Sequence, residues 1–245
     1  MNEPSAVTVL TGAGISTDSG IPDFRGPQGV WTKNPAAQAL VTLESYLADP
    51  DVRRRSWLAR RDHPAWNAEP NAGHRALVEL ERAGLLRALV TQNVDGLHQR
   101  AGSVPEKVIE IHGTLFRVEC VSCDLITPMR EVLDRVAAGE DDPPCPRCGG
   151  VQKANTISFG QSLKPDVLEA ALDAARSCEV FLAVGTSLTV HPAASLCGEA
   201  LDAGARLVIV NAQPTPYDPF ADQVINEPIG EALPTLVKEL IDAAR

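Results

Sequence analysis

No part of the sequence is long and apolar enough to cross a membrane as a helix, and positive charge is scarce. A membrane-spanning helix needs about 18 or more consecutive apolar residues, and no stretch of the 245 residues approaches that length. Lys and Arg total 22 against 32 Asp and Glu, which gives a formal net charge of −10. This excess of negative charge opposes non-specific binding to DNA and to anionic lipid surfaces. We therefore expect a protein that binds neither nucleic acid nor membranes, and that would attract a basic peptide.

The beginning of the chain also lacks the features of a secretion signal. Met1-Asn2-Glu3-Pro4 contains no basic residue, and the apolar run that starts at Val7 leads directly into a glycine loop. A signal peptide would need a basic region followed by a separate apolar core. We therefore expect a cytoplasmic protein. Its length allows one or two domains, which would bury about 70–75% of the surface of the unfolded chain.

Two closely spaced glycines follow the apolar run Val7–Leu10. Gly12 and Gly14 would let the backbone turn tightly after a buried strand and approach a phosphate, but Thr17 replaces the third glycine of the usual dinucleotide fingerprint. By itself, such a pair also fits a simple tight turn. The segment from Ser16 to Gly26 adds hydroxyl, carboxylate, aromatic and guanidinium side chains among Gly and Pro, a mixture typical of ligand-binding loops. Together the two features predict a nucleotide site.

Short apolar runs alternate with segments of helical periodicity over most of the chain, which predicts an α/β fold with a doubly wound parallel sheet. Its ligand crevice would lie at the carboxyl ends of the strands. The predicted strands are Val7–Leu10, Leu86–Thr91, Val108–Ile111, Val180–Val184 and Leu207–Val210. The predicted helices are Ala72–Ala83, Pro165–Arg176, Ala193–Ala203 and Gly230–Ala244. Two stretches, about 27–70 and 114–158, interrupt the alternation and predict inserted modules.

The second of these stretches contains two Cys-x-x-Cys pairs separated by 21 residues, close to the spacing of a zinc ribbon. Four thiolates complete a tetrahedron around zinc and leave no position for a substrate, so we expect one structural Zn²⁺ ion. Two disulfides are the alternative, but nothing in the sequence indicates an oxidising compartment. The pairs are Cys120 with Cys123 and Cys145 with Cys148. Cys178 and Cys197 lie in apolar helical contexts and are expected to be buried thiols.

Three histidines lie near these motifs. His112 follows Val108–Ile111 and precedes Gly113, which places it at the carboxyl edge of the predicted sheet, where a general base belongs. A structural histidine would fit that position as well. His98 is expected on a helix in a structural role, and His74 is expected to cap or pack its helix.

Several further motifs follow the glycine loop, which reads GAGIS and then GIPDFRG. They are Thr91-Gln92-Asn93-Val94-Asp95, Ile111-His112-Gly113, the two cysteine pairs, Ser158-Phe159-Gly160, Gly185-Thr186-Ser187 and Val210-Asn211. In this content and order the chain resembles the sirtuin family, the NAD-dependent protein lysine deacylases, over nearly its whole length. The resemblance implies a Rossmann-like NAD-binding domain (1–27, 72–113 and 159–245). It also implies a smaller domain made of a helical module (28–71) and a zinc ribbon (114–158).

The resemblance also implies roles for individual residues. His112 would be the general base, and Asn93 would be the second catalytic residue. NAD would be bound by the glycine loop and the strand ends, through Gly12, Ala13, Gly14, Ser16, Asp23, Phe24, Arg25, Trp31, Gln92, Asn93, Asp95, Gly185, Thr186, Ser187 and Asn211. The substrate peptide would pair with Ile157, Phe159 and Gly160, and zinc would be held by Cys120, Cys123, Cys145 and Cys148.

The function implied is transfer of an acyl group from a protein lysine to ADP-ribose, with release of nicotinamide. A protein mono-ADP-ribosyltransferase that uses the same NAD site is one alternative, and a non-catalytic zinc-ribbon binding module is another. Two departures from the family pattern leave the peptide preference open. Gln161 stands where the family often has Glu, and Lys153-Ala154 stands where it often has Arg-Pro.

The resemblance also bears on the acyl group. Sirtuins that prefer succinyl-lysine or malonyl-lysine carry a Tyr and an Arg three residues apart in the helical module, where the guanidinium meets the acyl carboxylate. This chain offers Trp57 and Arg60 at that spacing, or Ser56 and Ala59 in an alternative register, and neither pair includes a phenol. We therefore expect acetyl-lysine, or a longer apolar acyl-lysine, to be preferred.

Overall fold

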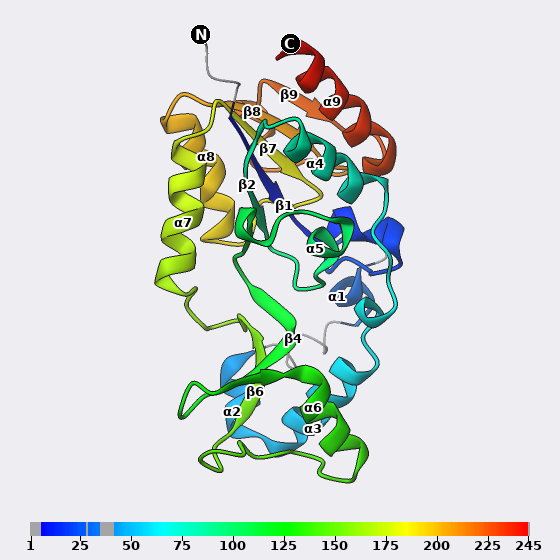
Figure 1. Cartoon of the computed structure of the whole chain (residues 1–245), viewed down its shortest axis with the longest axis vertical. Coiled ribbons are helices and arrows are strands. Elements are labelled where there is room, and N and C mark those ends of the chain that lie inside the picture. The colour runs from blue at the N-terminus through cyan, green and yellow to red at the C-terminus, as the bar shows by residue number, and fades with distance from the viewer. Residues whose placement is uncertain (1–5, 28, 35–41, 245) are drawn as a thin grey trace.

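The protein is described by a computed structural model covering residues 6–27, 29–34 and 42–244, and it forms a larger and a smaller region stacked along its long axis (Figure 1). The larger region contains a six-stranded sheet in the order β3-β2-β1-β7-β8-β9, in which every neighbouring pair is parallel. The strands are β1 (Val7–Thr11), β2 (Leu86–Thr91), β3 (Val108–Glu110), β7 (Val180–Val184), β8 (Arg206–Val210) and β9 (Gln223–Ile225). Strand order reverses between β1 and β7, so the ligand crevice of this fold lies at their carboxyl ends.

Helices cover both faces of this sheet (Figure 1). One face packs on α4 (Ala72–Arg82) and α9 (Ile229–Ala243), and the other packs on α7 (Pro165–Arg176) and α8 (Leu196–Asp202). Val9 belongs to the first of the two cores and Leu10 to the second, because successive side chains of a strand point to opposite faces. The sheet is therefore buried on both sides, and the prediction of a doubly wound α/β fold is confirmed.

The helix ends explain where the chain turns back to the sheet. Asn71 caps α4, since its side-chain oxygen accepts from the N–H groups of Gly73 and His74 while the His74 ring accepts from the Asn71 N–H. Gly84 follows the end of α4 with φ +79°, a conformation that favours glycine. The expectation that His74 caps its helix is confirmed.

The smaller region contains a three-stranded antiparallel sheet in the order β5-β4-β6. Trp57, which is fully buried, packs with Val118 and Met129, so helices of the first inserted stretch share a core with the second. The elements are β4 (Gly113–Cys120), β5 (Ile126–Pro128), β6 (Gln152–Thr156), α2 (Leu43–Ala48), α3 (Pro50–Arg61) and α6 (Met129–Ala137). The remaining α-helices of the described chain are α1 (Val30–Lys33), which precedes this region, and α5 (Leu97–Ala101), which follows β2.

Most predicted elements are found, with a few differences in detail. The segment Ala193–Ala203 begins as a 3₁₀ turn (Ala193–Ser195) and continues as α8, a common way for a helix to start. β3 ends at Glu110, although the Ile111 N–H still donates to the Thr91 carbonyl at 3.0 Å. Strand β9 was not predicted, because two of its three residues are exposed and it forms an edge without an apolar run. Among the described residues, no helix is both long and apolar enough to span a bilayer.

Candidate active site

The loops that follow β1 and β7 touch through glycines at the switch point of the sheet. Gly12 N–H donates to the Val184 carbonyl at 3.0 Å, and Gly14 N–H donates to the Gly185 carbonyl at 2.8 Å. A Cβ on Gly12 would lie 2.7 Å from the Gly185 oxygen, and one on Gly14 would lie 2.8 Å from the Gly185 Cα, so only glycine allows this approach. Gly185 itself has φ +62°. The glycines bring two strand ends into contact, and their N–H groups are engaged in doing so.

A buried polar cluster lies beside this contact. Ser16 Oγ donates to Asp95 Oδ2 at 2.7 Å, and Asn93 Nδ2 donates to Ser16 Oγ at 3.1 Å and to the Gly12 carbonyl at 3.0 Å. The exposed fractions of Ser16, Asn93 and Asp95 are 1%, 9% and 4%. Burial raises the pKa of Asp95, while the N–H of Leu97 and the Ser16 hydroxyl lower it. The cluster places a carboxyl and a carboxamide in a region largely closed to water.

His112 lies two residues past the end of β3 and is half-buried at the sheet edge. Its Nδ1 lies 3.1 Å from the Gln92 carbonyl oxygen, so Nδ1 carries the proton and Nε2 is the atom that can accept one. Burial lowers the pKa of His112, and the bond to Gln92 opposes this shift. At neutral pH the ring is therefore uncharged and suited to act as a general base.

The predicted NAD-binding residues that follow β2, β7 and β8 are held by hydrogen bonds of their own side chains. Gln92 Nε2 donates to Thr186 Oγ1 at 2.9 Å, which joins the ends of β2 and β7. Ser187 Oγ lies 2.8 Å from the Thr189 hydroxyl. Asn211, past β8, donates from its N–H to the Ile225 carbonyl at 3.0 Å and from Nδ2 to the Gln213 carbonyl at 2.7 Å. With the end of β1 between those of β2 and β7, these strand ends form one continuous edge that includes the glycine contact.

The loop from Asp23 to Arg25 lies between the glycine loop and α1. Asp23 Oδ1 accepts from the Gly26 N–H at 2.7 Å, and the Asp23 carbonyl accepts from the Val30 N–H at 2.9 Å, so Asp23 shapes this turn. The Phe24 side chain is 43% exposed, and burial lowers the pKa of Arg25. Ala13 begins the 3₁₀ helix Ala13–Ser19. The side chain of Trp31, and residues 28 and 35–41 of the predicted helical module, lie outside the described residues.

The predicted peptide-binding segment is held on both sides. Ile157 N–H donates to the His112 carbonyl at 2.9 Å, and the Phe159 carbonyl accepts from the Leu43 N–H at 2.9 Å. Phe159 also forms an isolated parallel bridge with Thr42. Phe159 is 42% exposed, and Gly160 is exposed with φ +82°. The segment therefore runs along the boundary of the two regions.

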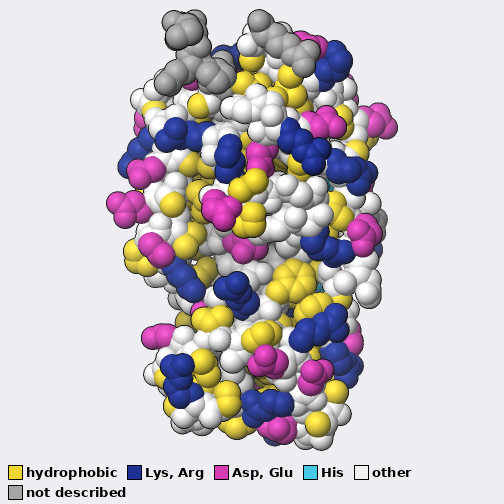
Figure 2. All heavy atoms as spheres, in the orientation of Figure 1, with side chains coloured by type: hydrophobic (Ala, Val, Ile, Leu, Met, Phe, Trp, Pro, Cys, Tyr) yellow, Lys and Arg dark blue, Asp and Glu magenta, His cyan; other side chains and the backbone are white. Residues whose placement is uncertain are grey.

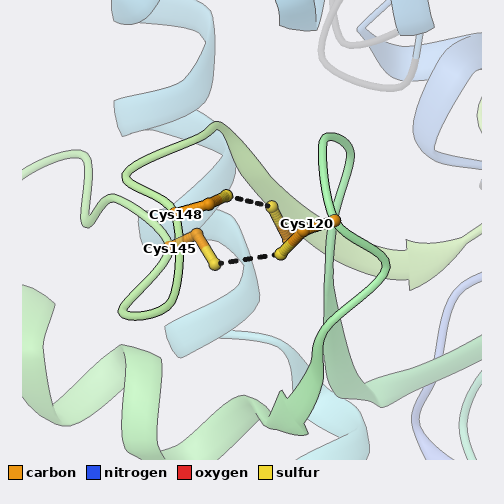
Figure 3. Close-up of side chains that lie close together, drawn as sticks. Cys120, Cys145 and Cys148 are labelled. Carbon is orange, nitrogen blue, oxygen red and sulfur yellow. Dashed lines mark hydrogen bonds between the residues drawn. The ribbon is translucent and has the colours of Figure 1, made fainter.

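The four predicted cysteine ligands come together at the end of the smaller region. Their sulfur atoms all lie within 4.8 Å of one another, with Cys120 to Cys148 at 3.5 Å and Cys123 to Cys145 at 3.7 Å (Figure 3). A tetrahedral zinc site with Zn–S bonds of about 2.3 Å requires S–S separations of about 3.8 Å. The arrangement therefore fits one Zn²⁺ ion. Gly149 turns the second knuckle with φ +73°, as its sequence position suggests.

Two thiols of this cluster, Cys145 and Cys148, differ in their pKa. Burial raises the pKa of Cys145, but the N–H groups of Cys148 and Arg147, together with hydrogen bonds to the thiols of Cys120 and Cys123, lower it to about 6. The Gly150 N–H lowers the pKa of Cys148, yet contacts with Cys123 and Cys120 raise it to about 12. Cys145 is therefore ionised more readily than Cys148, and a bound cation would favour the thiolate form of the cysteines that hold it. Cys178 and Cys197, by contrast, are buried free thiols, as expected.

His98 belongs to a buried network that the sequence did not indicate. Its Nε2 lies 3.0 Å from Thr11 Oγ1, which donates to Thr91 Oγ1 at 2.9 Å, and Thr91 Oγ1 accepts from the Asn93 N–H at 3.1 Å. The His98 and His74 rings lie 4.9 Å apart between centroids. Thr11 and Thr91 are the last residues of β1 and β2, and no pattern in the sequence indicates that their side chains bond to each other. The network places His98 beneath the polar cluster, without exposure to solvent.

A groove of about 810 Å³ lies between the two regions, bordered by α5, β3, β4 and α7. Ile157 lines it, but none of the predicted NAD-binding residues that the structure describes does. The outline of the molecule narrows between the regions in Figure 2, and basic and acidic side chains are interspersed on this face. Among the described residues of this face, Lys and Arg side chains therefore do not gather into a single patch.

Known proteins are similar to the chain over nearly its whole length. A sequence model of the Sir2 family matches residues 12–192. A protein of Streptomyces coelicolor, named NAD-dependent protein deacetylase 2, is 58% identical over 234 residues, which cover 96% of this chain and 97% of the relative. A solved Sir2 structure with deacetylated p53 peptide and 3′-O-acetyl ADP-ribose has a TM-score of 0.87 and 37% identity, covering 97% of this chain and 94% of the other. A second, described as Sir2 with p53 peptide and NAD⁺, has a TM-score of 0.85, 36% identity and the same coverage.

Proposed function

The chain belongs to the Sir2 family, and from this premise we propose that it is an NAD-dependent protein lysine deacylase that transfers the acyl group to ADP-ribose and releases nicotinamide. The main support for this proposal is the buried cluster of Ser16, Asn93 and Asp95 near the carboxyl ends of β1 and β2, together with the uncharged His112 past the end of β3. The relatives named as deacetylases and the Sir2 structures with peptide and NAD⁺ or an acetylated ADP-ribose support it.

NAD lies along the edge formed by the ends of β1, β2, β7 and β8. Asn93 and Asp95 hold the nicotinamide carboxamide, because Asn offers a donor and an acceptor and Asp accepts the amide N–H. Gln92 reaches the ribose hydroxyls. Arg25, Ser16 and the glycine loop hold the pyrophosphate side. Thr186, Ser187 and Asn211 contact the adenosine half. Trp31 also belongs to the proposed NAD site.

The reaction begins when the acyl oxygen of the modified lysine attacks C1′ of the nicotinamide ribose and nicotinamide leaves. An amide oxygen is a poor nucleophile, so the protein must hold the two atoms in contact and exclude water from the cation-like transition state. Phe24 shields that position. His112 Nε2 then takes a proton through the ribose hydroxyls, and the 2′-oxygen attacks the imidate carbon. Addition of water completes release of the lysine amine and leaves the acyl group on ADP-ribose.

The peptide lies between the two regions and pairs through its main chain with Ile157, Phe159 and Gly160. Main-chain pairing gives affinity with little demand on sequence. The larger region, proposed as 1–27, 72–113 and 159–245, holds NAD. The smaller region, proposed as 28–71 and 114–158, holds the peptide from the other side. One Zn²⁺ ion on Cys120, Cys123, Cys145 and Cys148 stabilises the smaller region and takes no part in the chemistry.

The proposal is tested by mass spectrometry of the purified protein with NAD and an acetyl-lysine peptide. We expect the deacetylated peptide, nicotinamide and O-acetyl-ADP-ribose in equal amounts. A stable mass gain of ADP-ribose on a protein, without a deacylated lysine, would show a mono-ADP-ribosyltransferase instead. No reaction and no shift of the melting temperature with NAD would leave only a binding module.

A further inference from the structure

The ammonium of Lys153 lies inside the smaller region, directly before the segment proposed to bind the peptide. Its side chain is 4% exposed, and its Nζ donates to Glu119 Oε1 at 2.7 Å, the Ala154 carbonyl at 3.0 Å and the Thr156 carbonyl at 2.8 Å. An ammonium has three N–H donors, so every one of them is used. Such a fully bonded buried charge holds its partners in fixed positions.

The pairing of β4 with β6 is interrupted next to these carbonyls. Gly113 pairs with Thr156 and Val118 pairs with Ala154, and the register is irregular between them. Four residues of β4, 114–117, therefore face one residue of β6, 155, as in a large bulge. The two carbonyls that Lys153 binds flank this interruption of the ladder.

The peptide segment leaves β6 at this point, and three of its hydrogen bonds hold it against neighbouring parts of the chain, besides the local turn between Ser158 and Gln161. The Thr156 carbonyl is held by Lys153, the Ile157 N–H by the His112 carbonyl, and the Phe159 carbonyl by the Leu43 N–H. The second and third are bonds between backbones. The first depends on one side chain, which a point substitution can remove.

We propose that Lys153 is a positioning residue for substrate peptide binding, which it serves by holding the start of the Ile157–Gly160 edge through the Thr156 carbonyl. The proposal rests on the proposed function, because it assumes that the peptide pairs with this edge. Glu119 balances the buried charge. Lys153 touches neither the predicted NAD residues nor the reacting atoms, so its loss should weaken peptide binding and leave NAD binding unchanged.

The test compares variants of the full zinc-loaded chain by steady-state kinetics with an acetyl-lysine peptide and NAD. Lys153→Met alone would leave the partly buried Glu119 with only the more distant Lys164, so the decisive variant is Lys153→Met with Glu119→Met. Replacing a buried ion pair by apolar side chains often preserves stability. We expect the peptide KM to rise by about tenfold or more, with a smaller change in kcat and an NAD KM within about twofold of wild type.

Two further variants separate positioning from charge and packing. Lys153→Arg keeps a charged donor and should restore the peptide KM to within about threefold of wild type. Lys238→Met is the matched control, because Lys238 forms an exposed ion pair with Asp242 on α9 in the larger region and should leave the peptide KM unchanged. Melting temperature and zinc content confirm that each variant is folded.

A peptide KM at the wild-type value in the folded double variant would overturn the proposal. If that variant does not fold, Lys153→Gln takes its place, with a raised peptide KM expected and an unchanged one again contradicting the proposal. Different results contradict the proposed function and the role of Lys153. A wild-type protein that does not deacylate overturns the proposed function, whereas an active wild type with insensitive variants overturns only the role of Lys153.

Discussion

The two regions of the molecule are stabilised in different ways. In the larger region the sheet is buried on both faces by apolar side chains, and ion pairs such as Arg176 with Glu199 lie at the surface. In the smaller region the core is limited, and charges are part of the interior, as in the pair of Arg53 and Asp142 at 2.7 Å. A small core needs additional links such as a metal or buried ion pairs. The larger region, proposed to bind NAD, is therefore stabilised by its apolar cores. The smaller region, proposed to hold the peptide, depends instead on buried ion pairs and on zinc.

The largest expected effect comes from removing the metal. Chelation, or Cys145→Ser, should abolish deacylation, because a structural zinc site supplies folding energy to the region that holds it. Amide hydrogen exchange should show loss of protection in β4 and β6, with β1, β2 and β7 still protected. Cys178→Ala, outside the cluster, should retain zinc. Full activity in a protein shown to contain no zinc would contradict the expectation that the smaller region, unlike the larger one, needs a metal to fold.

In the larger region, Asn93→Ala should lower kcat/KM by about 10²–10⁴-fold, because it removes a buried donor from the proposed nicotinamide site. The melting temperature should change little, since the sheet is held by its apolar cores. Asn67→Ala, at an exposed position, is the matched control. If kcat/KM of the variant falls only in proportion to its fraction of folded protein, Asn93 has a structural role and no catalytic one.

The choice of acyl group is expected to depend on the smaller region. Trp57 is fully buried in the smaller core, and Arg60 has a buried Nε for which the described residues provide no hydrogen-bond partner. No phenol accompanies this arginine at the expected spacing. The kcat/KM for acetyl-lysine or a longer apolar acyl-lysine should therefore exceed that for succinyl-lysine by at least about tenfold, which corresponds to a difference of about 1.4 kcal/mol in the free energy of transition-state binding. Kinetics on one peptide carrying each acyl group measure this ratio. Equal or faster desuccinylation would refute it and implicate Arg60.

The smallest effect on activity is expected from His98→Ala. Loss of this buried ring should cost about 1–3 kcal/mol of stability, while kcat/KM stays within about threefold once the protein is folded. Burial lowers the pKa of His98 well below its usual value and that of His74 to about 4, so below pH 6.5 the unfolded chain binds more protons than the folded one. Wild-type stability should therefore fall as pH drops from 6.5 towards 4, and less steeply in the variant. Denaturant melts at pH 7 and 5 compare the two slopes.

Much of the larger region could be predicted, because its strands are continuous apolar runs with glycines at their ends. β2, β7 and α7 begin and end where the sequence indicates. The smaller sheet was harder to predict, since β6 reads Gln-Lys-Ala-Asn-Thr and its pairing depends on Lys153 and on distant β4. The four cysteines were predictable from spacing alone. The network through Thr11 and Thr91 was not, because side-chain bonds between strands leave no periodic pattern.

The central claim is that His112 is the general base of an NAD-dependent deacylase, and His112→Ala tests it most directly. Burial keeps the pKa of His112 below its usual value, so wild-type kcat/KM should be level near pH 7 and fall as pH drops through that pKa, when the ring is protonated. At pH 7.5 the variant should lose about 10²–10⁴-fold in kcat/KM with an acetyl-lysine peptide, and keep its melting temperature and NAD binding. His191→Ala, at an exposed position, should match wild type. Near-normal turnover in folded His112→Ala would contradict the account.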